Sequence, residues 1–362
     1  MKSNYKRLGD LINTVSVKNT DMITDDLRGV NYQKYFMPSV ANTIGVDLSG
    51  YKVIKNGQFA CNLMHVGRDK CLPVALHRDE KPIIVSPAYF SFEVKDESEI
   101  LSEFLFLWFK RAEFDREACF YTDADVRQGL MKSSLFDIKI PVPPIEEQRK
   151  IVAEYKAIER RIENNRRLIS TLEATAQTIY RKMFVDNIDP ENLPEGWRIG
   201  VVGDLFTLQR GHDLPSQNRM YGEIPIYAST GINGYHNEYR VKAPCVVTGR
   251  SGSIGVVNYV TSDFWPLNTT LFVKECEKSS MEYAFFKLKE LELEKLVAGF
   301  AAVPTLNRNY VHMIKCIVAP KNYINEFSIR VSPMFAGVNV INKEIKILEQ
   351  TLSLILSKLS NM

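Results

Sequence analysis

Apolar residues recur in steps of three and four along two long stretches of the chain. In the first stretch these positions run from Ile151 to Met183, and with the residues before them they predict a helix over 145–183. In the second stretch the same steps run from Phe327 to Leu359. A seam of this spacing is typical of helices that pack together as a coiled coil. The chain is therefore expected to form two long, paired helices.

The two predicted helices differ at positions that bear on their packing. Asn165 is a polar residue within the first seam and is expected to fix the register at some cost in stability, whereas Ile341 takes the corresponding place in the second. The start of the second helix is open. Pro333 either kinks a helix that begins before it, or lies in the first turn with Ser332 as the N-cap. The seam residues that precede Pro333 favour the kink.

The chain repeats itself once, at a constant offset equal to the spacing between Leu130 and Leu306. The other pairs of identical residues at this spacing are Ile138 and Ile314, Lys139 and Lys315, Val142 and Val318, Pro144 and Pro320, Leu172 and Leu348, Glu173 and Glu349, and Thr175 and Thr351. A weaker match opens each copy, where Gly9-Asp10-Leu11 resembles Gly203-Asp204-Leu205. Each copy thus consists of a globular module followed by a long helix.

Two similar seams in one chain could form an internal helix pair or a zipper between two chains. A globular module separates the two seams, which favours an internal antiparallel pair. We therefore expect the order module, helix, module, helix, closed into a pseudo-twofold circular arrangement.

Short runs of β-branched and aromatic residues, separated by Gly, Pro and Asn, fill the modules at 1–143 and about 194–320. These runs predict strands at 51–54, 83–85, 90–94, 245–247, 256–260 and 270–273. Each module also has a helical stretch before its closing strand, at 99–114 and at 281–297. The expected fold class is α+β, with two similar mixed modules and curved, mostly antiparallel sheets.

Composition is that of an ordinary globular protein, with 45% hydrophobic and 25% charged residues. We find no apolar run of the roughly 18 residues that a membrane span needs, and no apolar segment behind the basic start that would make a signal peptide. The six cysteines show no C-x-x-C pair, so they are expected to be reduced thiols of a cytoplasmic protein. A net charge of +3 indicates a polyanionic partner only weakly.

Several loops of both modules are rich in side chains that contact nucleic acid. Arg and Lys can bind guanine, Asn and Gln can bind adenine, and glycines let the backbone approach phosphates. The alternative is that these loops are ordinary turns of a β-rich domain. The candidate DNA-binding residues are His65, Arg68, Lys70, His77 and Arg78 in the first module, and Gln209, Arg210, His212, Ser229, Thr230, Asn233, Tyr235, His236, Arg250 and Ser251 in the second.

Signals for catalysis are weak. The glycine-rich run at 249–255 is followed by a strand-like segment where a phosphate loop needs a helix, and no Gly-Lys-Ser/Thr closes it. Two segments match the carboxylate pattern of metal-dependent nucleases, in which an acidic residue precedes a second one followed by x-Lys. They are Asp79 with Glu93-Val94-Lys95, and Asp125 with Asp137-Ile138-Lys139. The pattern is short, and the second copy has Met313 in place of Asp137. The histidines and cysteines lack zinc-ligand spacing, so we expect neither a catalytic residue nor a metal site.

Motifs across most of the chain resemble the specificity (S) subunit of type I restriction–modification systems. The most specific of them is PPIEEQR at 143–149, which opens the first helix. Others are LPEGWRIGVVGDL at 193–205 and VPTLNRNYVHMIKCIVAP at 303–320. In the second module, YASTGINGYHNEY at 227–239 and VVTGRSGSIGVV at 246–257 are also similar to this family.

The resemblance implies two target recognition domains, at 1–143 and 185–321, and two spacer helices, at 144–184 and 322–362. Each recognition domain would read one half of a bipartite sequence in double-stranded DNA. The helices would set the separation of the halves and dock two methyltransferase (M) subunits, which restriction (R) subunits join. This chain would need no cofactor, since S-adenosylmethionine, ATP and Mg²⁺ would serve those partners.

Two departures from the family pattern are visible. The second helix lacks the PPIEEQ entry, which puts its partner contacts in doubt, and Gln128 stands where the family often has glycine. The geometry suits the hypothesis, because readers on one face of B-DNA lie about 34–36 Å apart and a helix over 145–183 is roughly 58 Å long. A non-catalytic, cytoplasmic DNA-recognition subunit is the leading hypothesis. The alternatives are a stand-alone metal-dependent nuclease and a coiled-coil adaptor that binds no DNA.

Overall fold

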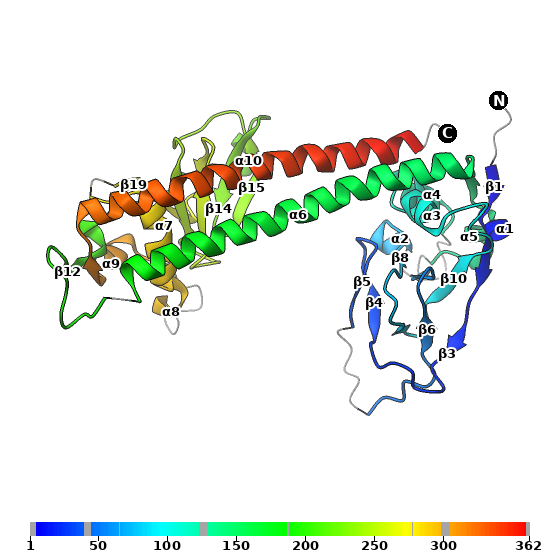
Figure 1. The fold of residues 1–362 in the computed structure, drawn as a ribbon. Coiled ribbons are helices and arrows are strands. Elements are labelled where there is room, and N and C mark those ends of the chain that lie inside the picture. Colours follow the sequence, from blue (N-terminus) through cyan, green and yellow to red (C-terminus); the bar gives the residue numbers. More distant parts are fainter. Residues whose placement is uncertain are drawn as a thin grey trace. The chain divides into compact units, whose positions relative to one another are not determined.

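The computed structural model describes residues 5–39, 45–64, 66–122, 129–186, 188–276, 278–297 and 305–359. The chain divides into two compact units. Unit 1 comprises Met1–Glu163 and Ile345–Met362, and unit 2 comprises Asn164–Glu344. Two long helices, α6 (Ile145–Phe184) and α10 (Lys321–Leu359), contribute to both units (Figure 1).

The two long helices begin at positions related by the offset of the repeat, and both predicted helices are confirmed. Helix α10 continues through Pro333, so a start at Ser332 is wrong. Proline has no N–H to donate to the carbonyl group of Ile329 one turn earlier. The side chain of Ile329 is 76% exposed, so water can reach this turn of the helix and hydrate that carbonyl group.

Within each unit the helices pair in opposite directions, which confirms the antiparallel coiled coil. In unit 1 the start of α6, with Val152 and Tyr155, shares a core with Leu359 at the end of α10. In unit 2 the end of α6, with Tyr180, shares a core with Phe327 near the start of α10. These residues are all at most 9% exposed, so the seam is a continuation of each module's core.

Unit 1 is built around a four-stranded antiparallel sheet with the order β2-β10-β7-β8. Its strands are β2 (Ile12–Thr14), β7 (Phe59–Cys61), β8 (Val74–Leu76) and β10 (Phe90–Val94). The other strands are β1 (Tyr5–Arg7) with β11 (Lys139–Pro141), β3 (Val17–Lys18) with β6 (Lys52–Ile54) and β9 (Ile83–Val85), and β4 (Arg28–Val30) with β5 (Phe36–Pro38). The short helices are α1 (Leu8–Leu11), α2 (Val66–Asp69), α3 (Ser102–Phe109), α4 (Ala112–Phe120) and α5 (Lys132–Asp137).

Unit 2 has the corresponding four-stranded sheet, with the order β13-β19-β16-β17. Its strands are β13 (Thr207–Arg210), β16 (Cys245–Gly249), β17 (Val257–Val260) and β19 (Thr270–Glu275). The other strands are β12 (Arg198–Val201) with β20 (Lys315–Val318), and β14 (Ile224–Ala228) with β15 (Gly231–His236) and β18 (Trp265–Pro266). The short helices are η1 (Val202–Asp204), η2 (Ser216–Asn218), α7 (Met281–Glu290), α8 (Leu293–Val297) and α9 (Arg308–His312).

The predicted strands all form, but the sheets are more divided than expected. Each unit has several small sheets in place of one curved sheet, and β14 pairs with β18 in parallel. The helical stretch predicted at 99–114 breaks at Arg111, whose backbone is extended and whose guanidinium stacks 3.7 Å from the centre of the Trp108 ring. The stretch at 281–297 breaks at Glu292, which has a φ of +44°. A further helix, α5 or α9, precedes the closing strand in each unit.

The internal duplication extends to the backbone register. Strand β1 pairs with β11 at Tyr5 and Pro141, and β12 pairs with β20 at the equivalent Ile199 and Ile317. The hydrogen bond from Leu8 N to the Ile138 carbonyl group, 2.8 Å long, is repeated from Val202 N to the Ile314 carbonyl group at 3.0 Å. Pro141 and Ile317 are related by the offset of the repeat, and so are Ile138 and Ile314. The backbone that leads into each long helix is therefore built in the same way in both copies.

The same design explains a glycine near the start of each copy. A Cβ atom on Gly9 would lie 2.9 Å from the Cβ of Phe136, and one on Gly203 would lie 3.3 Å from the Cβ of His312. Phe136 and His312 are themselves equivalent positions of the repeat. The small size of glycine thus lets the short helix at this position pack closely on the turn that leads into the last strand in both copies.

The glutamine of the PPIEEQR motif is a buried clamp in unit 1. Gln148 is fully buried, accepts a hydrogen bond from Leu101 N at 2.9 Å, and donates to the carbonyl oxygens of Glu99 at 2.8 Å and Pro143 at 2.9 Å. Its equivalent in unit 2, Ile324, is buried but makes apolar contacts. In unit 2 the helix that corresponds to α3 is α7, which is capped by Ser280, whose side chain accepts from Tyr283 N. The missing motif in the second copy therefore reflects a different way of fixing the adjacent helix.

Candidate nucleic-acid interface

In unit 2 the structure brings several predicted DNA-binding loops together at one end of the central sheet. Arg250 N and Ser251 N both donate to the carbonyl oxygen of Thr269, and Gly211 N donates to that of Thr270. A Cβ atom on Gly252 would lie 3.4 Å from Ser229 Oγ. The segments around residues 211, 229, 250 and 269 therefore form one cluster, although they are far apart in the sequence.

Two glycines make this loop cluster possible. A Cβ atom on Gly249 would collide with the carbonyl oxygen of Ser253, and one on Gly211 would collide with that of Leu267. The glycine-rich run at 249–255 therefore serves a tight turn with close backbone packing. It is followed by strand β17, as the sequence predicted, and not by a helix.

The candidate residues of unit 2 differ in how much of each side chain solvent can reach. Most of them are exposed or half-buried: Gln209, Arg210, His212, Thr230, Asn233, Tyr235, Arg250 and Ser251. Ser229 and His236 are buried, and His236 Nδ1 accepts a hydrogen bond from Met220 N at 3.0 Å. A buried side chain cannot reach a base edge without rearrangement, so these two serve the fold of the loop cluster.

One arginine and two histidines surround Trp265 beside this cluster. The Arg240 guanidinium lies 4.8 Å above its ring, and the rings of His236 and His212 meet it edge-on at 5.2 and 6.4 Å. Trp265 is 5% exposed, so its buried ring is the common packing partner of these three side chains. Neither Trp265 nor Arg240 was identified from the sequence. A tryptophan within a short strand is expected to belong to the hydrophobic core, and without it nothing marks Arg240.

In unit 1 the candidate residues lie on two separate segments. His65 lies outside the described residues. Arg68 and Lys70 are exposed at the end of α2, where Arg68 pairs with Asp69 at 2.7 Å and Lys70 adopts a positive φ of 56°. His77 is 3% exposed and donates from Nε2 to the carbonyl oxygen of Lys81 at 2.8 Å. Like His236, it holds a turn in place.

Arg78 is fixed by a carboxylate that it shares with helix α6. Its Nε and Nη2 donate to the two oxygens of Glu103 at 2.9 and 2.8 Å, and Lys156 of α6 lies 2.7 Å from the same carboxylate. Burial disfavours the charged form of Glu103, but the two cations outweigh it and hold the pKa of Glu103 below its ordinary value. The Arg78 guanidinium also lies 4.8 Å above the ring of Phe106. Arg78 thus ties the first module to α6.

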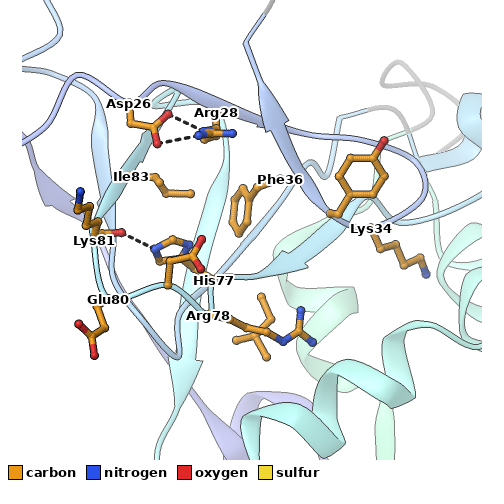
Figure 2. Close-up of a pocket in the computed structure, with 12 residues that line it drawn as sticks. Asp26, Arg28, Lys34, Phe36, His77, Arg78, Glu80, Lys81 and Ile83 are labelled. Atoms are coloured by element: carbon orange, nitrogen blue, oxygen red, sulfur yellow. Dashed lines mark hydrogen bonds and ion pairs between the residues drawn. The ribbon is translucent and has the colours of Figure 1, made fainter. Parts of the chain in front are cut away.

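A cavity of about 640 Å³ opens beside the turn that carries His77 and Arg78. Figure 2 shows Phe36 and Ile83 on its walls, with the ion pair of Asp26 and Arg28 at one side. Arg28 Nη2 donates to Asp26 Oδ2 at 2.9 Å. Because acidic and basic groups alternate around this cavity, it has no uniform charge that would select a phosphate or a cation.

Two carboxylates of the nuclease-like pattern are engaged within the fold, and a third, Asp79, lines the cavity beside His77. Glu93 accepts from Gln58 at 2.9 Å, Lys95 donates to the backbone of α1, and Asp137 pairs with Arg7. Asp125 lies outside the described residues. Among the described residues, no group of three His, Cys, Asp or Glu side chains could hold a metal ion.

All six cysteines are free thiols, and burial raises the pKa of Cys245 to about 12. No helix within the described ranges is long and apolar enough to span a membrane.

Comparison with known proteins places this architecture in a family. The model of the type I restriction modification DNA specificity domain matches residues 2–174 and 194–308, one stretch in each copy of the repeat. The chain belongs to this family. Because the model matches twice, the two copies are two examples of the same specificity domain.

Individual relatives agree with this assignment. The type I restriction enzyme MjaIX specificity subunit of Methanocaldococcus jannaschii is 23% identical over 317 residues, which cover 77% of this chain and 72% of the relative. The crystal structure of the type I restriction-modification S subunit from M. genitalium has the same fold, with a TM-score of 0.66 at 16% identity. That alignment covers 99% of this chain and 96% of the other. The specificity-subunit fold thus extends over the whole chain.

Proposed function

We propose that this chain is the DNA-recognition subunit of a type I restriction–modification complex, and that each unit reads one half of a bipartite target. One observation carries the proposal: the two units have the same central sheet and helix entry but different peripheral sheets. In unit 1 the order β3-β6-β9 is entirely antiparallel, whereas in unit 2 β14 lies between an antiparallel β15 and a parallel β18. A shared frame with divergent surfaces suits two readers of two unlike sequences.

Contacts in unit 2 are proposed to come from the exposed members of the loop cluster. We propose Arg250 as the residue that reads a base edge, because it is half-buried, lies between glycines, and has one guanidinium nitrogen 3.4 Å from the Asn268 carbonyl oxygen. Arg210 is half-exposed and only loosely paired, at 3.9 Å from Asp213, which suits a phosphate contact. In unit 1 we propose Arg68 and Lys70 as phosphate contacts, because both are exposed.

The remaining roles also belong to this proposal. The long helices act as the spacer between the two readers and as the docking site of two methyltransferase subunits, to which restriction subunits bind. Methyl transfer and cleavage belong to those partners, so this chain is non-catalytic, binds no cofactor, and acts in the cytoplasm.

The decisive experiment is methylation profiling of DNA from cells that express this chain with its methyltransferase partner. We expect one interrupted motif, modified on both strands. Replacing residues 194–320 with the corresponding module of another specificity subunit should change one half of the motif. Inserting one heptad into α6 should lengthen the gap and leave both halves unchanged. A changed base preference within a half after that insertion would refute the spacer role.

Two single substitutions test the contacts. Arg250→Ala should relax the preference at one base pair, at a cost of about 1–3 kcal/mol in discrimination. Arg210→Ala should weaken binding to all sequences and lower the salt dependence by about one ion. Metal-dependent cleavage by the isolated chain would favour the nuclease alternative. Binding of a methyltransferase with no salt-dependent shift of DNA would favour the adaptor.

A further inference from the structure

Four exposed apolar side chains lie on and just before the hairpin β14–β15 of unit 2, whose strands are labelled in Figure 1. Tyr221 is fully exposed, and Met220 is 60% exposed. On strand β15 itself, Ile232 and Tyr235 are 54% and 52% exposed. A single exposed apolar side chain is common on a protein surface, but four of them on two adjoining segments are typical of a binding surface.

The loop that carries Tyr221 is pinned to β15 and its end at three points. Arg219 Nη1 donates to the carbonyl oxygen and the side-chain oxygen of Asn233 at 2.9 and 3.1 Å. Met220 N donates to His236 Nδ1 at 3.0 Å. A Cβ atom on Gly222 would collide with the carbonyl oxygen of His236, so the backbone there presses against the end of β15. The exposed ring of Tyr221 is therefore presented by a braced backbone.

Two arginines near these segments have no carboxylate partner in the described part of the chain. Arg219 donates to an uncharged asparagine, and Arg240 rests on the ring of Trp265. No ion pair of either guanidinium is found among the described residues. An apolar tip with unneutralised cations on the same part of the unit is complementary to a nucleic-acid duplex, in which stacked bases lie between two rows of phosphates.

We propose that Tyr221 is a wedge that enters a base step of the half-site read by unit 2 and kinks the duplex there. This deepens the proposed function and rests on it. The location of the wedge argues against a docking surface for the methyltransferase. Two identical partner subunits need the same surface on both copies of the repeat, whereas the wedge is built on the sheet in which the two units differ.

The test uses the full chain with its methyltransferase partner and a duplex that carries the mapped target. The duplex bears a fluorophore pair at its ends to report bending, and 2-aminopurine at successive positions of the half-site to report unstacking. For Tyr221→Ala we expect loss of the bend, loss of the 2-aminopurine signal at one step, and a rise in Kd of roughly tenfold, as for the loss of one base–aromatic contact. Tyr221→Phe should keep all three, because the ring supplies the wedge.

The matched control is Tyr310→Ala, which removes a 55% exposed tyrosine from α9, part of the frame that the two copies share. It should leave bending and affinity unchanged. Bending and fluorescence that are unaltered in Tyr221→Ala would overturn the wedge, and loss of methyltransferase co-purification in that variant would assign the surface to a protein partner instead. Failure of the wild-type complex to bind any duplex would refute the proposed function itself, and the wedge with it.

Discussion

Gln148 offers the sharpest test of how the first module is attached to its helix. Its amide bridges Leu101 N at the start of α3 and the carbonyl groups of Glu99 and Pro143, and it is fully buried. Gln148→Ala removes all three hydrogen bonds. The N–H of Leu101 and these two carbonyl oxygens have no other hydrogen-bond partner among the described residues, so each is left unsatisfied in a poorly hydrated place.

The expected loss follows from this count. A buried hydrogen bond contributes about 0.5–1.5 kcal/mol net, and an orphaned buried group costs about 1–3 kcal/mol. Some of these groups will recruit water, so we expect the free energy of unfolding of unit 1 to fall by about 3 kcal/mol. At roughly 2–4 °C per kcal/mol for a domain of this size, the transition should fall by roughly 6–12 °C.

Differential scanning calorimetry of the full chain measures this shift. Hydrogen exchange provides a second readout, because the amides of α3 should lose protection before those of the central sheet. The matched control is Gln350→Ala, which removes an exposed glutamine from α10 in the same unit and should change little. If the two variants melted within about a degree of each other, the clamp would contribute nothing and the reasoning would be wrong.

Three further predictions concern other buried polar groups. Asn165 is 4% exposed with no hydrogen-bond partner for Nδ2 in the described part of the chain, so Asn165→Leu should raise the melting temperature of the isolated chain, by an amount equal to about 1–3 kcal/mol. His312 Nε2 accepts from Leu208 N at 2.8 Å, and burial, with a smaller effect of a nearby arginine, lowers the pKa of His312 below 6.5. Because the unfolded chain takes up the proton first as the pH falls, unit 2 should lose stability in calorimetry below about pH 6.5. His312→Phe should abolish that pH dependence. Lys34 is 6% exposed and its ammonium group lies 2.7 Å from the carboxylate of Asp115. Lys34→Met leaves that carboxylate without its ion-pair partner, so chemical denaturation should show that the free energy of unfolding falls by about 3–5 kcal/mol. Adding Asp115→Leu removes the unpaired charge and should restore part of the loss.

The long helices could be predicted because their seams are repetitive and one-dimensional. The positions from Ile151 to Met183 that define the first seam are all buried or half-buried. The strands were found for a similar reason, since short β-branched runs such as 83–85 are buried along their whole length. The register of the duplicated frame also followed from the sequence, because the offset of the repeat stays constant from the last strand to the end of the helix.

The polar interior could not be read from the sequence in the same way. His77 and His236 looked like nucleic-acid ligands, yet each bonds to a group on a neighbouring turn that only the folded chain brings near. The role of Gln148 was hidden because a glutamine among charged helix residues usually faces water. At the break between α3 and α4, Arg111 stacks on Trp108, a contact that the sequence did not indicate.

The two copies divide their contacts in a way that bears on how such a chain changes its target. The frame of each unit is joined by backbone hydrogen bonds and strand pairing that hardly depend on side chains, as at Leu8 and Val202. Side chains on that frame have diverged freely, with Gln148 in one copy where the other has Ile324. The peripheral sheets differ even in strand direction, and they carry the exposed groups such as Tyr221. A module exchanged at the start of a long helix should therefore keep its backbone pairing, but in unit 1 the new module must also supply partners for Gln148, which bonds Leu101 N and the carbonyl group of Glu99.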